Sequence, residues 1–534
     1  MKRTLLNTLL FFFSMGLFAQ QMQSGASRKL NFAQFAIQNL YVDKIDENKL
    51  AEDAIEGMLK KLDPHSTYMN VQEVKEMNEP LQGNFEGIGI QFNMMNDTLF
   101  VIQTISGGPS EKVGIVAGDR IISVNDTLIA GKKMKTNDIM KRLKGQKGTI
   151  VNVKVLRRNE KNLIDFRIVR DKIPIFSVDA SYMVDKFIGY IRISRFGATT
   201  YDEFMAALKS LKKQGMKNLI LDLEDNGGGY LNAATSIADE FLKLKQLIVY
   251  TEGLHQTKDE TFATQKGIFE DGKLVVLIDE SSASASEIVT GAIQDWDRGV
   301  IVGRRSFGKG LVQRPIPLPD GSMIRLTVAR YYTPSGRCIQ KSYEAGADKY
   351  GKDLIERYNK GEMAHADSIH FPDSLKAYTK LNHRIVYGGG GIMPDIFVPI
   401  DTSRFTNYHR DIVAKGVLNK FCINYIDQNR KTLKANYPDV TQFIDHFVVT
   451  DVILKGLIAA AEADKIKRDS IQLEKARPLL VIQIKALLAR DIFDVAAYFR
   501  VINQDNEIFK KGIAILQDER QYGKLLMGKK PNSR

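Results

Sequence analysis

The chain has 534 residues, which is too long for one compact domain and indicates three or four. Its 44% hydrophobic and 26% charged residues are ordinary for a folded soluble protein, so the composition argues against disorder. The formal net charge is +13, and from residue 402 onward there are 23 Lys and Arg residues against 15 Asp and Glu residues. Because these basic residues are dispersed among acidic and apolar ones, we expect a solvated helical surface there and no nucleic-acid contact.

The first 19 residues are typical of a secretory signal peptide. Lys2 and Arg3 precede an apolar run from Leu5 to Ala19, and the small Ala19 is a plausible cleavage point. The run is short for a membrane-spanning helix. We therefore expect an exported, periplasmic protein, with an uncleaved anchor in the inner membrane as the alternative.

Helical and β-rich regions follow one another in the first third of the chain. Residues 29–80 carry apolar side chains at helical spacing, and Asp63-Pro64 interrupts that pattern. Residues 84–172 show strand-like alternation and glycine turns. A small β-rich module with two helices, one of them over 135–143, is expected there.

Residues 173–402 alternate buried strands with helices, which indicates a sheet with at least a parallel portion. Within this region, residues 341–386 are polar and irregular and are interpreted as an insertion. Residues 403–534 return to a helical pattern. The expected strands are 219–223, 274–278 and 300–303, and the expected helices are 233–242 and 285–296.

Metal and cofactor sites have no support in the sequence. The two cysteines, Cys338 and Cys422, form no CxxC motif, which argues against a disulfide framework and a cysteine zinc site. One disulfide between them stays open, because it depends on a spatial proximity that sequence does not show. None of the seven histidines lies in an HExxH motif, so we expect no metal and no cofactor.

Ser284 lies where a strand gives way to a helix. Unpaired N–H groups and the positive dipole potential at a helix N-terminus stabilise an oxygen that becomes anionic during acyl transfer. Ser284 is therefore a candidate nucleophile. The alternative is that the serines of this segment only cap the helix.

Lys309 lies 25 positions after Ser284, between Gly308 and Gly310. A free lysine, with a pKa near about 10.4, stays protonated, but burial lowers a lysine pKa by up to about 3–5 units. A neutral lysine is able to take the proton of a serine without histidine. Gln313 is a candidate to orient Lys309 if the chain bends near Gly310, because four residues of strand span about 13 Å. The alternative for Lys309 is an ordinary surface charge.

Two glycine-rich segments need an interpretation. Residues 303–309 match the first seven positions of a P-loop, but Gly310 occupies the place of the Ser or Thr that holds magnesium. Residues 311–317 contain two prolines and cannot form the helix that should follow, so nucleotide binding is rejected. The turn at 226–229 lacks GxGxxG spacing, and it is either a tight strand–helix connection or a source of an N–H group for an oxyanion.

These motifs occur in one order with several others, and together they resemble the carboxyl-terminal processing proteases of serine peptidase family S41 (tail-specific proteases). The resemblance covers residues 29–402 and is specific, because many separate motifs recur in one order. The segments that carry it are Gly57-Met58-Leu59, Leu62-Asp63-Pro64-His65-Ser66, Phe85-Glu86-Gly87-Ile88-Gly89-Ile90, Ala117-Gly118-Asp119, Ser282-Ala283-Ser284-Ala285-Ser286-Glu287-Ile288, Phe307-Gly308-Lys309-Gly310-Leu311-Val312-Gln313, Tyr332-Thr333-Pro334-Ser335-Gly336-Arg337 and Gly391-Ile392-Met393-Pro394-Asp395.

The resemblance implies a multidomain α+β and α/β architecture. A PDZ domain would occupy residues 84–172, and a mixed-sheet, crotonase-like protease core would occupy residues 173–402, between helical regions at 29–80 and 403–534. A PDZ domain takes a peptide C-terminus as an added strand. The loop that holds the peptide carboxylate maps to Gly87, Ile88, Gly89 and Ile90.

The family mechanism is acyl-enzyme formation and hydrolysis, with no metal and no nucleotide. By the resemblance, Ser284 is the catalytic serine, Lys309 is its general base and Gln313 orients the lysine. The backbone N–H groups of Ala285 and Gly228 are the oxyanion donors that the family pattern implies. The resemblance thus implies a serine endopeptidase that acts on proteins or peptides with apolar C-termini.

Two departures from the family pattern leave questions open. The family has arginine after the Asp-Leu pair that precedes the glycine turn, whereas Glu224 stands there in this chain. The insertion at 341–386 and the region beyond 405 lie outside the shared pattern, and the helical ends are candidates for homo-oligomer or adaptor contacts. A catalytically silent PDZ-type peptide-binding or scaffold protein is the alternative function.

Overall fold

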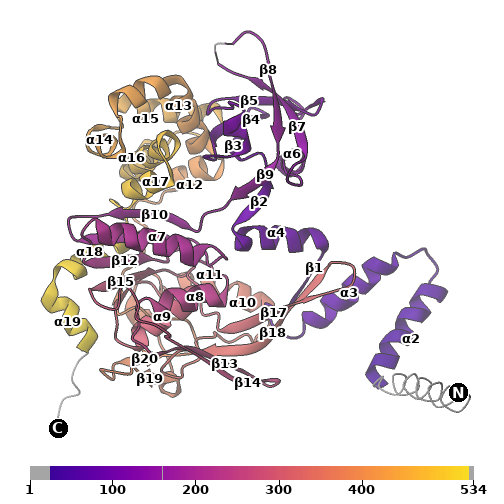
Figure 1. Ribbon diagram of the computed structural model, residues 1–534, viewed down its shortest axis with the longest axis vertical. Helices are drawn as coiled ribbons and strands as arrows, with labels where there is room; N and C mark the ends of the chain where they lie inside the picture. The colour runs from indigo at the N-terminus through magenta and orange to yellow at the C-terminus, as the bar shows by residue number, and fades with distance from the viewer. Residues whose placement is uncertain (1–24, 159, 528–534) are drawn as a thin grey trace, which may run out of the picture.

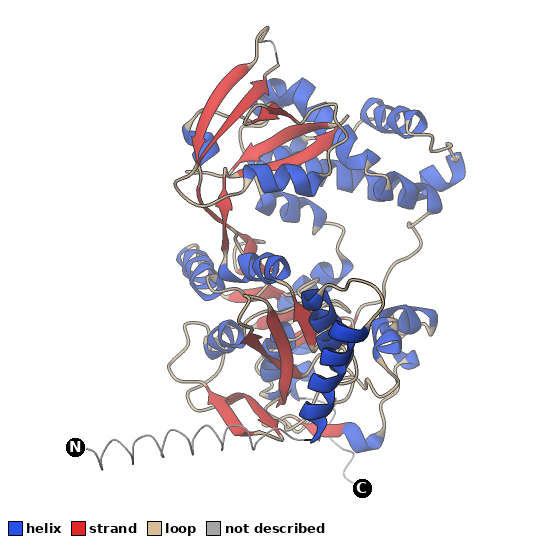
Figure 2. Cartoon of the chain, turned by 90° about the vertical axis from the view of Figure 1, so that its right-hand side faces the viewer, coloured by secondary structure: helices blue, strands red, loops and turns tan. Residues whose placement is uncertain are grey.

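A computed structural model describes residues 25–158 and 160–527 of the chain (Figure 1). The expected signal peptide at 1–19 lies outside the described residues. Figures 1 and 2 show a strand-rich body, above which a small β-rich module and a helical bundle lie side by side. Across the described ranges, no helix has both the length and the apolar character that crossing a membrane requires.

Helices open the described chain, as the spacing of apolar residues predicted. α2 (Gly25–Leu40) and α3 (Glu47–Leu59) project from the body, and α2 has no buried residue (Figure 1). The short strand β1 (Thr67–Met69) follows, and then α4 (Val71–Gln82) leads directly into the β-rich module. The turn before β1 is fixed by the Asp63 carboxylate, which accepts hydrogen bonds from the backbone N–H groups of His65 and Ser66.

The β-rich module is a six-stranded antiparallel sheet packed against a helix. β3 is an edge strand, bonded to β4 on one side only. The helix α6 (Thr136–Leu143) matches the expected helix and places Ile139 and Leu143 in the core of the module. A ribbon of β2 (Asn84–Gly87) and β9 (Asp171–Pro174) joins the module to the body. The strands of the sheet are β3 (Ile90–Met95), β4 (Thr98–Thr104), β5 (Arg120–Val124), β6 (Thr127–Leu128), β7 (Ile150–Leu156) and β8 (Ile164–Val169).

The body is built on a six-stranded central sheet. Five of its strands are parallel neighbours and β10 pairs antiparallel with β11, which confirms the predicted parallel portion. The three central strands β12, β15 and β16 overlap the three strands expected from the sequence. In spatial order the strands are β10 (Val178–Met183), β11 (Ile188–Ile193), β12 (Asn218–Asp222), β15 (Leu274–Ile278), β16 (Val300–Gly303) and β21 (Ile396–Phe397).

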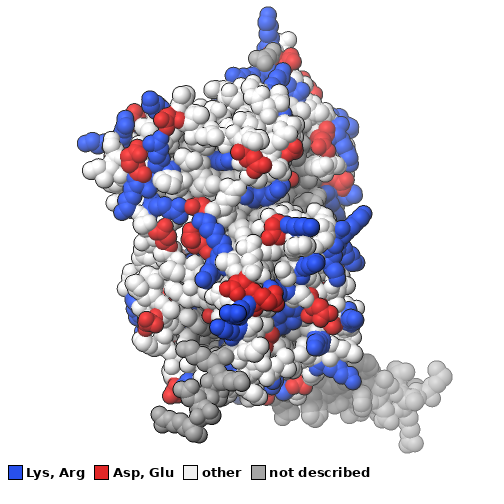
Figure 3. Space-filling view, turned by 90° about the vertical axis from the view of Figure 1, so that its left-hand side faces the viewer, with Lys and Arg blue, Asp and Glu red and all other residues white. Residues whose placement is uncertain are grey.

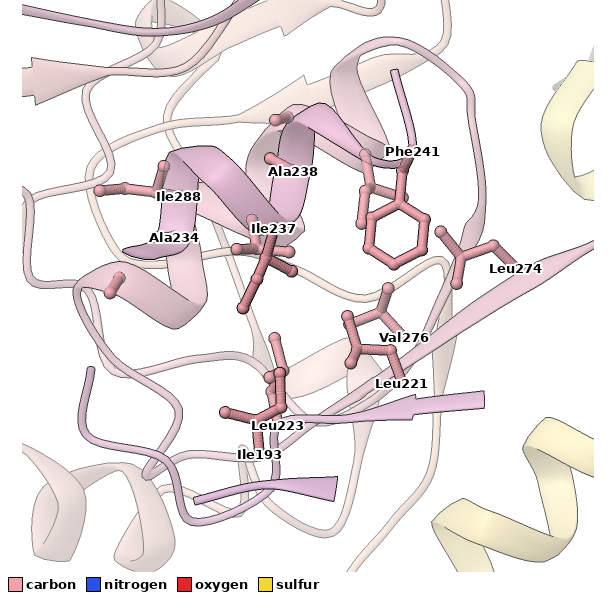
Figure 4. Close-up of a cluster of buried hydrophobic side chains, with 14 of the residues drawn as sticks. Ile193, Leu221, Leu223, Ala234, Ile237, Ala238, Phe241, Leu274, Val276 and Ile288 are labelled. Atoms are coloured by element: carbon pink, nitrogen blue, oxygen red, sulfur yellow. The ribbon is translucent and has the colours of Figure 1, made fainter. Parts of the chain in front are cut away.

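One face of the central sheet, termed the front face, is covered by α7 (Thr200–Lys213), α8 (Leu231–Asp239) and α9 (Ala285–Asp295). Figure 4 shows side chains of α8 and α9 packed against Leu221 and Val276 of the sheet. α8 ends three residues before the expected boundary. The apolar pattern misled that prediction, because Phe241 is buried in a turn after the helix.

The opposite face, termed the rear face, is covered by helices from the end of the described chain. Ile508 and Phe509 of α18 (Glu507–Gln517) share a buried cluster with Tyr190 and Val275 of the central sheet. Tyr522 of α19 (Glu519–Met527) belongs to the same cluster. Residues that the sequence left unassigned therefore complete the core of the body.

A second sheet and the insertion flank the central sheet. β17 (Leu311–Pro317) and β18 (Met323–Tyr332) form a hairpin, and β18 also pairs with β1 and with β13 (Leu247–Gly253), which in turn pairs with β14 (Gln256–Phe262). The insertion at 341–386 is more regular than its polar sequence indicated. It holds the helices α10 (Ala347–Gly351) and α11 (Asp353–Asn359) and a hairpin of β19 (Lys376–Tyr378) with β20 (Ile385–Tyr387).

A helical bundle occupies the first part of the C-terminal region. Its helix α13 packs against the β-rich module, where Ile423 meets Phe100 and Ile102, and Arg120 pairs with Asp427 at 2.9 Å. The bundle comprises α12 (Asn407–Ala414), α13 (Val417–Asn436), α14 (Val440–His446), α15 (Asp451–Ala463), α16 (Ser470–Ile492) and α17 (Val495–Ile502).

The structure shows the state of the two cysteines and the distribution of charged side chains on one face. Cys338 and Cys422 are free thiols, so the disulfide considered between them is not formed. Figure 3 shows Lys and Arg side chains interspersed with Asp and Glu side chains over the face that it presents.

Candidate active site

Ser284 occupies a sharp turn between β15 and α9. Its backbone has φ 56° and ψ −114°, a conformation that non-glycine residues rarely adopt. The turn places Ser284 immediately before the first residue of a buried helix, where N–H groups lack helical partners. Such strain is kept only where the surroundings enforce it, and it clusters at functional sites.

The side chain of Glu287 holds the backbones of Ser284 and Lys309 together. Its Oε2 accepts hydrogen bonds from the N–H of Ser284 at 2.8 Å and the N–H of Lys309 at 2.9 Å. Its Oε1 accepts from the Ser306 hydroxyl at 2.6 Å and the Gly308 N–H at 2.7 Å. Burial raises the pKa of Glu287 to about 7, while these four donors favour its ionised form.

Tyr331 makes a second link between the same two residues. Its hydroxyl lies 2.6 Å from the carbonyl oxygen of Lys309 and 3.1 Å from that of Ser284. Tyr331 is almost fully buried, and burial raises its pKa well above the usual range, so its hydroxyl stays a hydrogen-bond donor. Ser284 and Lys309 are thus tied by their N–H groups to one carboxylate and by their carbonyls to one hydroxyl.

Glu287 lies within one of the sequence motifs without a predicted role, and Tyr331 was not among the predicted site residues. A signal for Glu287 was present, since a serine followed three residues later by glutamate marks the start of a helix. Tyr331 offered no comparable signal. Its position opposite Ser284 depends on the pairing of β17 with β18, which spacing alone does not reveal.

The side chain of Lys309 is mostly buried. Burial lowers the pKa of Lys309 to about 8, and the nearby Arg325 guanidinium acts in the same direction, whereas Glu287 and Asp63 oppose the shift. A substantial fraction of a lysine with this pKa is neutral slightly above physiological pH. The prediction that burial makes Lys309 a base near neutral pH therefore has a physical cause in this structure.

Five predicted site residues line one cavity of about 590 Å³: Ser284, Ala285, Lys309, Gln313 and Gly228. Within the described chain, no hydrogen bond joins the Ser284 hydroxyl to the Lys309 amine. Gln313 does not reach Lys309 either, and its buried Nε2 has no hydrogen-bond partner. β17 has a register shift between Val312 and Gln313, but the contact that a bend near Gly310 would allow is not made.

The glycine turn lies directly against the nucleophile. A Cβ on Gly228 would lie 2.7 Å from the Ser284 Cβ and 2.9 Å from the Ala285 nitrogen, so only glycine fits there. The turn is braced by buried Asn226, whose Oδ1 accepts from the Gly228 N–H at 2.9 Å and whose Nδ2 donates to the Ile193 carbonyl. Because the Gly228 N–H is engaged within the turn, its role as an oxyanion donor stays a prediction.

Asn226 also explains how the glycine turn is held in a chain that has Glu224 where the family has arginine. The turn is braced by the amide of Asn226, while Glu224 accepts a hydrogen bond from Asn506, the residue that caps α18, at 3.0 Å. Burial and the nearby Asp222 and Asp279 raise the pKa of Glu224 well above its usual range. One departure from the family pattern, Glu224, thus contacts the other, the C-terminal region.

The insertion supports the loop that carries Lys309. Arg357 of α11 is buried and donates to the carbonyls of Arg305 at 2.7 Å and Ser306 at 3.1 Å. Tyr350 of α10 lies against Phe307, and its hydroxyl is 2.8 Å from Nε2 of His65. Burial and the charge of Lys309 lower the pKa of His65 to about 4, so this ring is neutral.

The predicted carboxylate loop connects β2 to the edge strand β3. The carbonyls of Ile88 and Gly89 accept hydrogen bonds from Ser110 and Ile105, which fix the loop. Gly89 has φ +74°, and a Cβ there would lie 3.0 Å from the Ile173 side chain. β3 has a free edge, which is the kind of edge that an extended peptide pairs with in β-strand addition.

The structure bears on the P-loop alternative and on the arrangement of possible metal ligands. The segment after Lys309 forms the strand β17 instead of the helix that a P-loop requires. Among the described residues, no group of three or more His, Cys, Asp or Glu side chains is arranged to hold a metal ion.

Family models match four parts of the chain. The model described as Peptidase family S41 matches residues 187–347, and the PDZ domain model matches residues 87–168. The model described as the activating protease CtpB N-terminal domain matches residues 17–73. Residues 408–494, within the helical bundle, match a family of unknown function.

Similar proteins are found among curated sequences and solved structures. The carboxy-terminal-processing protease of Bartonella bacilliformis is 40% identical over 309 residues, which cover 57% of this chain and 70% of the relative. The carboxy-terminal processing protease CtpB of Bacillus subtilis is 37% identical over 328 residues, covering 60% of this chain and 67% of the relative. The solved structure of the photosystem II D1 C-terminal processing protease is 30% identical, covers 57% of this chain and 82% of its own, and has a TM-score of 0.33.

These matches define the class of protein as a serine-type peptidase, a hydrolase, with a PDZ domain. The chain belongs to the carboxy-terminal processing proteases of peptidase family S41. The β-rich module is its PDZ domain, and the body built on the central sheet is its protease core.

Proposed function

We propose that this peptidase engages the C-terminal ends of protein substrates through its PDZ domain and cuts them with Ser284 and Lys309. The observation that carries the proposal is the double link through Glu287 and Tyr331, which holds both residues at one cavity. The lowered pKa of Lys309 and the strained backbone of Ser284 both favour a catalytic role, because a lysine with a purely structural role requires neither feature.

In the proposed first step, neutral Lys309 takes the proton of the Ser284 hydroxyl as that oxygen attacks the peptide carbonyl carbon. The carbonyl π electrons move to oxygen and give a tetrahedral oxyanion. The Ala285 N–H at the start of α9 would stabilise that oxyanion, together with an N–H of the glycine turn at Gly228. Protonated Lys309 then gives its proton to the departing amine, which leaves an acyl-enzyme on Ser284.

In the second step, a water molecule takes the place of the released amine. Lys309 accepts a proton from the water as it attacks the ester carbonyl carbon. When the second tetrahedral intermediate collapses, Lys309 gives that proton to the Ser284 oxygen, which restores the hydroxyl and the neutral lysine and releases the new C-terminus. In this scheme Gln313 orients the lysine once substrate closes the cavity, since its Nε2 otherwise has no partner. Catalytic hydrogen bonds that are long without substrate often tighten in its complex.

Recognition of the C-terminal end is assigned to the PDZ groove beside β3. The edge strand would pair with the substrate backbone, and the loop at Gly87, Ile88, Gly89 and Ile90 would hold its carboxylate. The half-buried side chains of Ile90 and Phe92 pack on the core of the PDZ domain and offer an apolar surface for the last side chains of the substrate. This arrangement fits substrates with apolar C-termini.

The test is degradation of a model protein that carries an apolar C-terminal tail. The full chain should degrade it, while the Ser284→Ala variant should bind the tail without cutting. A tail that ends in an amide should slow degradation, because the loop would lose its carboxylate. Equal degradation by the Ser284→Ala variant would contradict the assignment of the nucleophile.

A catalytically silent PDZ-type scaffold is the second candidate function. It is favoured by the missing hydrogen bond between Ser284 and Lys309 and by the unpartnered Gln313 amide. The two functions predict different responses to a serine-directed acylating probe. A scaffold would bind tail peptides but neither cut them nor react with the probe, whereas the peptidase would do both.

We also propose that the protein is exported to the periplasm with residues 1–19 removed. The support is the basic start and apolar run in the sequence. Cell fractionation and N-terminal sequencing test this proposal. A mature chain that begins at Gln20 in the periplasmic fraction is expected, and a full-length protein in the inner membrane would indicate the uncleaved anchor instead.

The projecting N-terminal helices are proposed to pair with a second copy of the chain. Large apolar side chains of α2 are exposed, among them Phe32 at 71% and Leu40 at 80%. A helix with an uncovered apolar face needs a partner surface. Light scattering should give a dimer or larger assembly, and the paired substitutions Phe32→Ser and Phe35→Ser should yield the monomer.

A further inference from the structure

Two arginines in the active-site cavity have no carboxylate partner among the described residues. Arg195 follows β11 and Arg325 lies in β18, and both line the cavity that contains Ser284 and Lys309. Neither appears in any ion pair of the described chain. A cavity that already holds a cationic lysine thus carries two further cations.

Arg325 is partly buried and its guanidinium is poorly satisfied. Its Nε is buried without a hydrogen-bond partner, and its Nη1 makes only a long contact of 3.8 Å to the sulfur of Met77. Asp63, whose charge acts on Arg325, already accepts hydrogen bonds from His65, Ser66 and Thr327. Asp63 therefore does not neutralise Arg325 directly.

The backbone just after Arg195 reaches α4, the helix that also carries Met77. A Cβ on Gly197, two residues after Arg195, would lie 2.9 Å from the carbonyl oxygen of Leu81 in α4. Met77, which contacts Arg325, precedes Leu81 by four residues, or about 6 Å of helix. Met77 and Leu81 of α4 line the same cavity as the two arginines.

Other arginines of the body are satisfied either by carboxylates or, as Arg298 is, by backbone carbonyls. Arg337 pairs with Asp295 at 2.8 Å, and Arg384 pairs with Asp297 at 2.6 Å and also with Asp395. Buried charges without partners are costly, and natural proteins pair them or use them for a ligand. Arg195 and Arg325 are partly buried at the cavity and form no ion pair with another described residue, so a carboxylate of a ligand would meet two guanidinium groups there.

We propose that Arg195 and Arg325 bind a carboxylate of the substrate within a few residues of the scissile bond. This inference rests on the proposed peptidase function and adds a second element of substrate choice beyond the PDZ groove. Guanidinium groups match carboxylates with paired hydrogen bonds in a fixed geometry. The carboxylate would come from an Asp or Glu side chain, or from the C-terminus of a substrate cut close to its end.

Ten-residue fluorogenic peptides distinguish the two sources. One series has an amidated C-terminus and carries Glu or Gln at each position around the scissile bond. A second series has only neutral side chains and ends in a free acid or an amide. Amidated peptides give the PDZ loop no carboxylate, so a preference for Glu within the first series reports on the active-site cavity.

Rates should be compared on the high-pH plateau of each variant. Removing Arg325 takes a positive charge away from Lys309 and so raises the lysine pKa, which would alter rates at neutral pH for any substrate. On the plateau, the wild-type chain should cut a Glu peptide about tenfold better in kcat/KM than its Gln counterpart. The double variant Arg195→Gln, Arg325→Gln should reduce that ratio to near one.

The matched control is Arg314→Gln. Arg314 follows Gln313 in β17, is exposed and does not line the cavity. Its substitution therefore removes an arginine from the same hairpin without changing the cavity. The Glu preference should survive in this control. A preference for the free acid instead of Glu would assign the pair to the substrate C-terminus.

A binding measurement separates this inference from the proposed function. Amidated Glu and Gln peptides are titrated into the Ser284→Ala variant, where no turnover is needed, and tighter binding of Glu that requires both arginines supports the inference. Equal binding and equal rates for Glu, Gln, acid and amide peptides would overturn it, even if Ser284-dependent cleavage is intact. A preference that persists in the double variant would overturn it as well.

Discussion

The two faces of the central sheet differ in where their residues come from. The front face is covered by α8 and α9, which follow their strands closely in sequence and carry the glycine turn and Ser284. The rear face is covered by α18 and α19, more than 200 residues after the strands that they cover. The Peptidase S41 model covers the front-face helices but ends at residue 347, well before α18.

The two faces therefore have different roles: the front face organises the candidate active site, and the rear face contributes to stability. Glu287 and Tyr331 organise the site at the front, whereas Phe509 and its neighbours close the core at the rear. Glu224 is the contact between them, because it follows β12 and bonds Asn506 at the start of α18. Substitutions on the two faces should therefore change different measurements.

The largest effect is expected for Ser284→Ala on the front face. If Ser284 is the nucleophile, its loss should lower kcat by about 10⁴-fold or more, as for other serine peptidases. Thermal unfolding should stay within a few degrees of the wild type, since the hydroxyl is not part of the core. Retained activity in a peptidase assay would show that another residue attacks the substrate.

The rear face is tested most strongly by Phe509→Ala. Phe509 is 6% exposed and meets Tyr190 edge-on with 5.3 Å between ring centroids. Its removal should lower the free energy of unfolding by about 3–5 kcal/mol. The kcat of the folded fraction should not change, and the exposed Met527→Ala is the matched control with little effect on denaturant unfolding.

Glu287→Gln tests the front face without removing a reactive group. The amide would turn an N–H₂ group toward two of the four donors that now meet the carboxylate, so the Ser284 and Lys309 backbones would separate. We expect kcat to fall by about 10- to 100-fold, which corresponds to about 1.4–2.7 kcal/mol. Glu224→Gln is the control, and an equal loss of kcat in both variants would refute the special role of Glu287.

Glu224→Gln should itself change stability in a pH-dependent manner. The folded-state pKa of Glu224 is raised, so its contribution to stability is present below the unfolded pKa of about 4.3 and is lost as pH rises through the folded value. Glutamine cannot ionise and keeps the contact with Asn506. The variant should match the wild type near pH 4 and be a few degrees more stable at pH 9 by thermal unfolding; the reverse trend would contradict the raised pKa.

Local motifs predicted more of the front face than of the rear. The strand–Ser–helix junction at Ser284 and the glycines around Lys309 are local signals, so sequence placed them correctly in the fold. Tyr331 comes from a partner strand and the contact of Glu224 with Asn506 spans 282 positions, so no local pattern pointed to either. The helices of the C-terminal region were predicted from periodicity, but the sheet face that they cover is a tertiary property.

The central claim is that Lys309 is the base for Ser284, and the pH dependence of Ser284 acylation tests it most directly. The rate of reaction with a serine-directed acylating probe should be measured from pH 6 to 10 in the wild type and in Lys309→Ala. Because the folded pKa of Lys309 is lowered to about 8, the wild-type rate should rise with pH and reach half its plateau near pH 8. Lys309→Ala should abolish that titration and most of the rate, whereas the same rate and profile in both proteins would contradict the account.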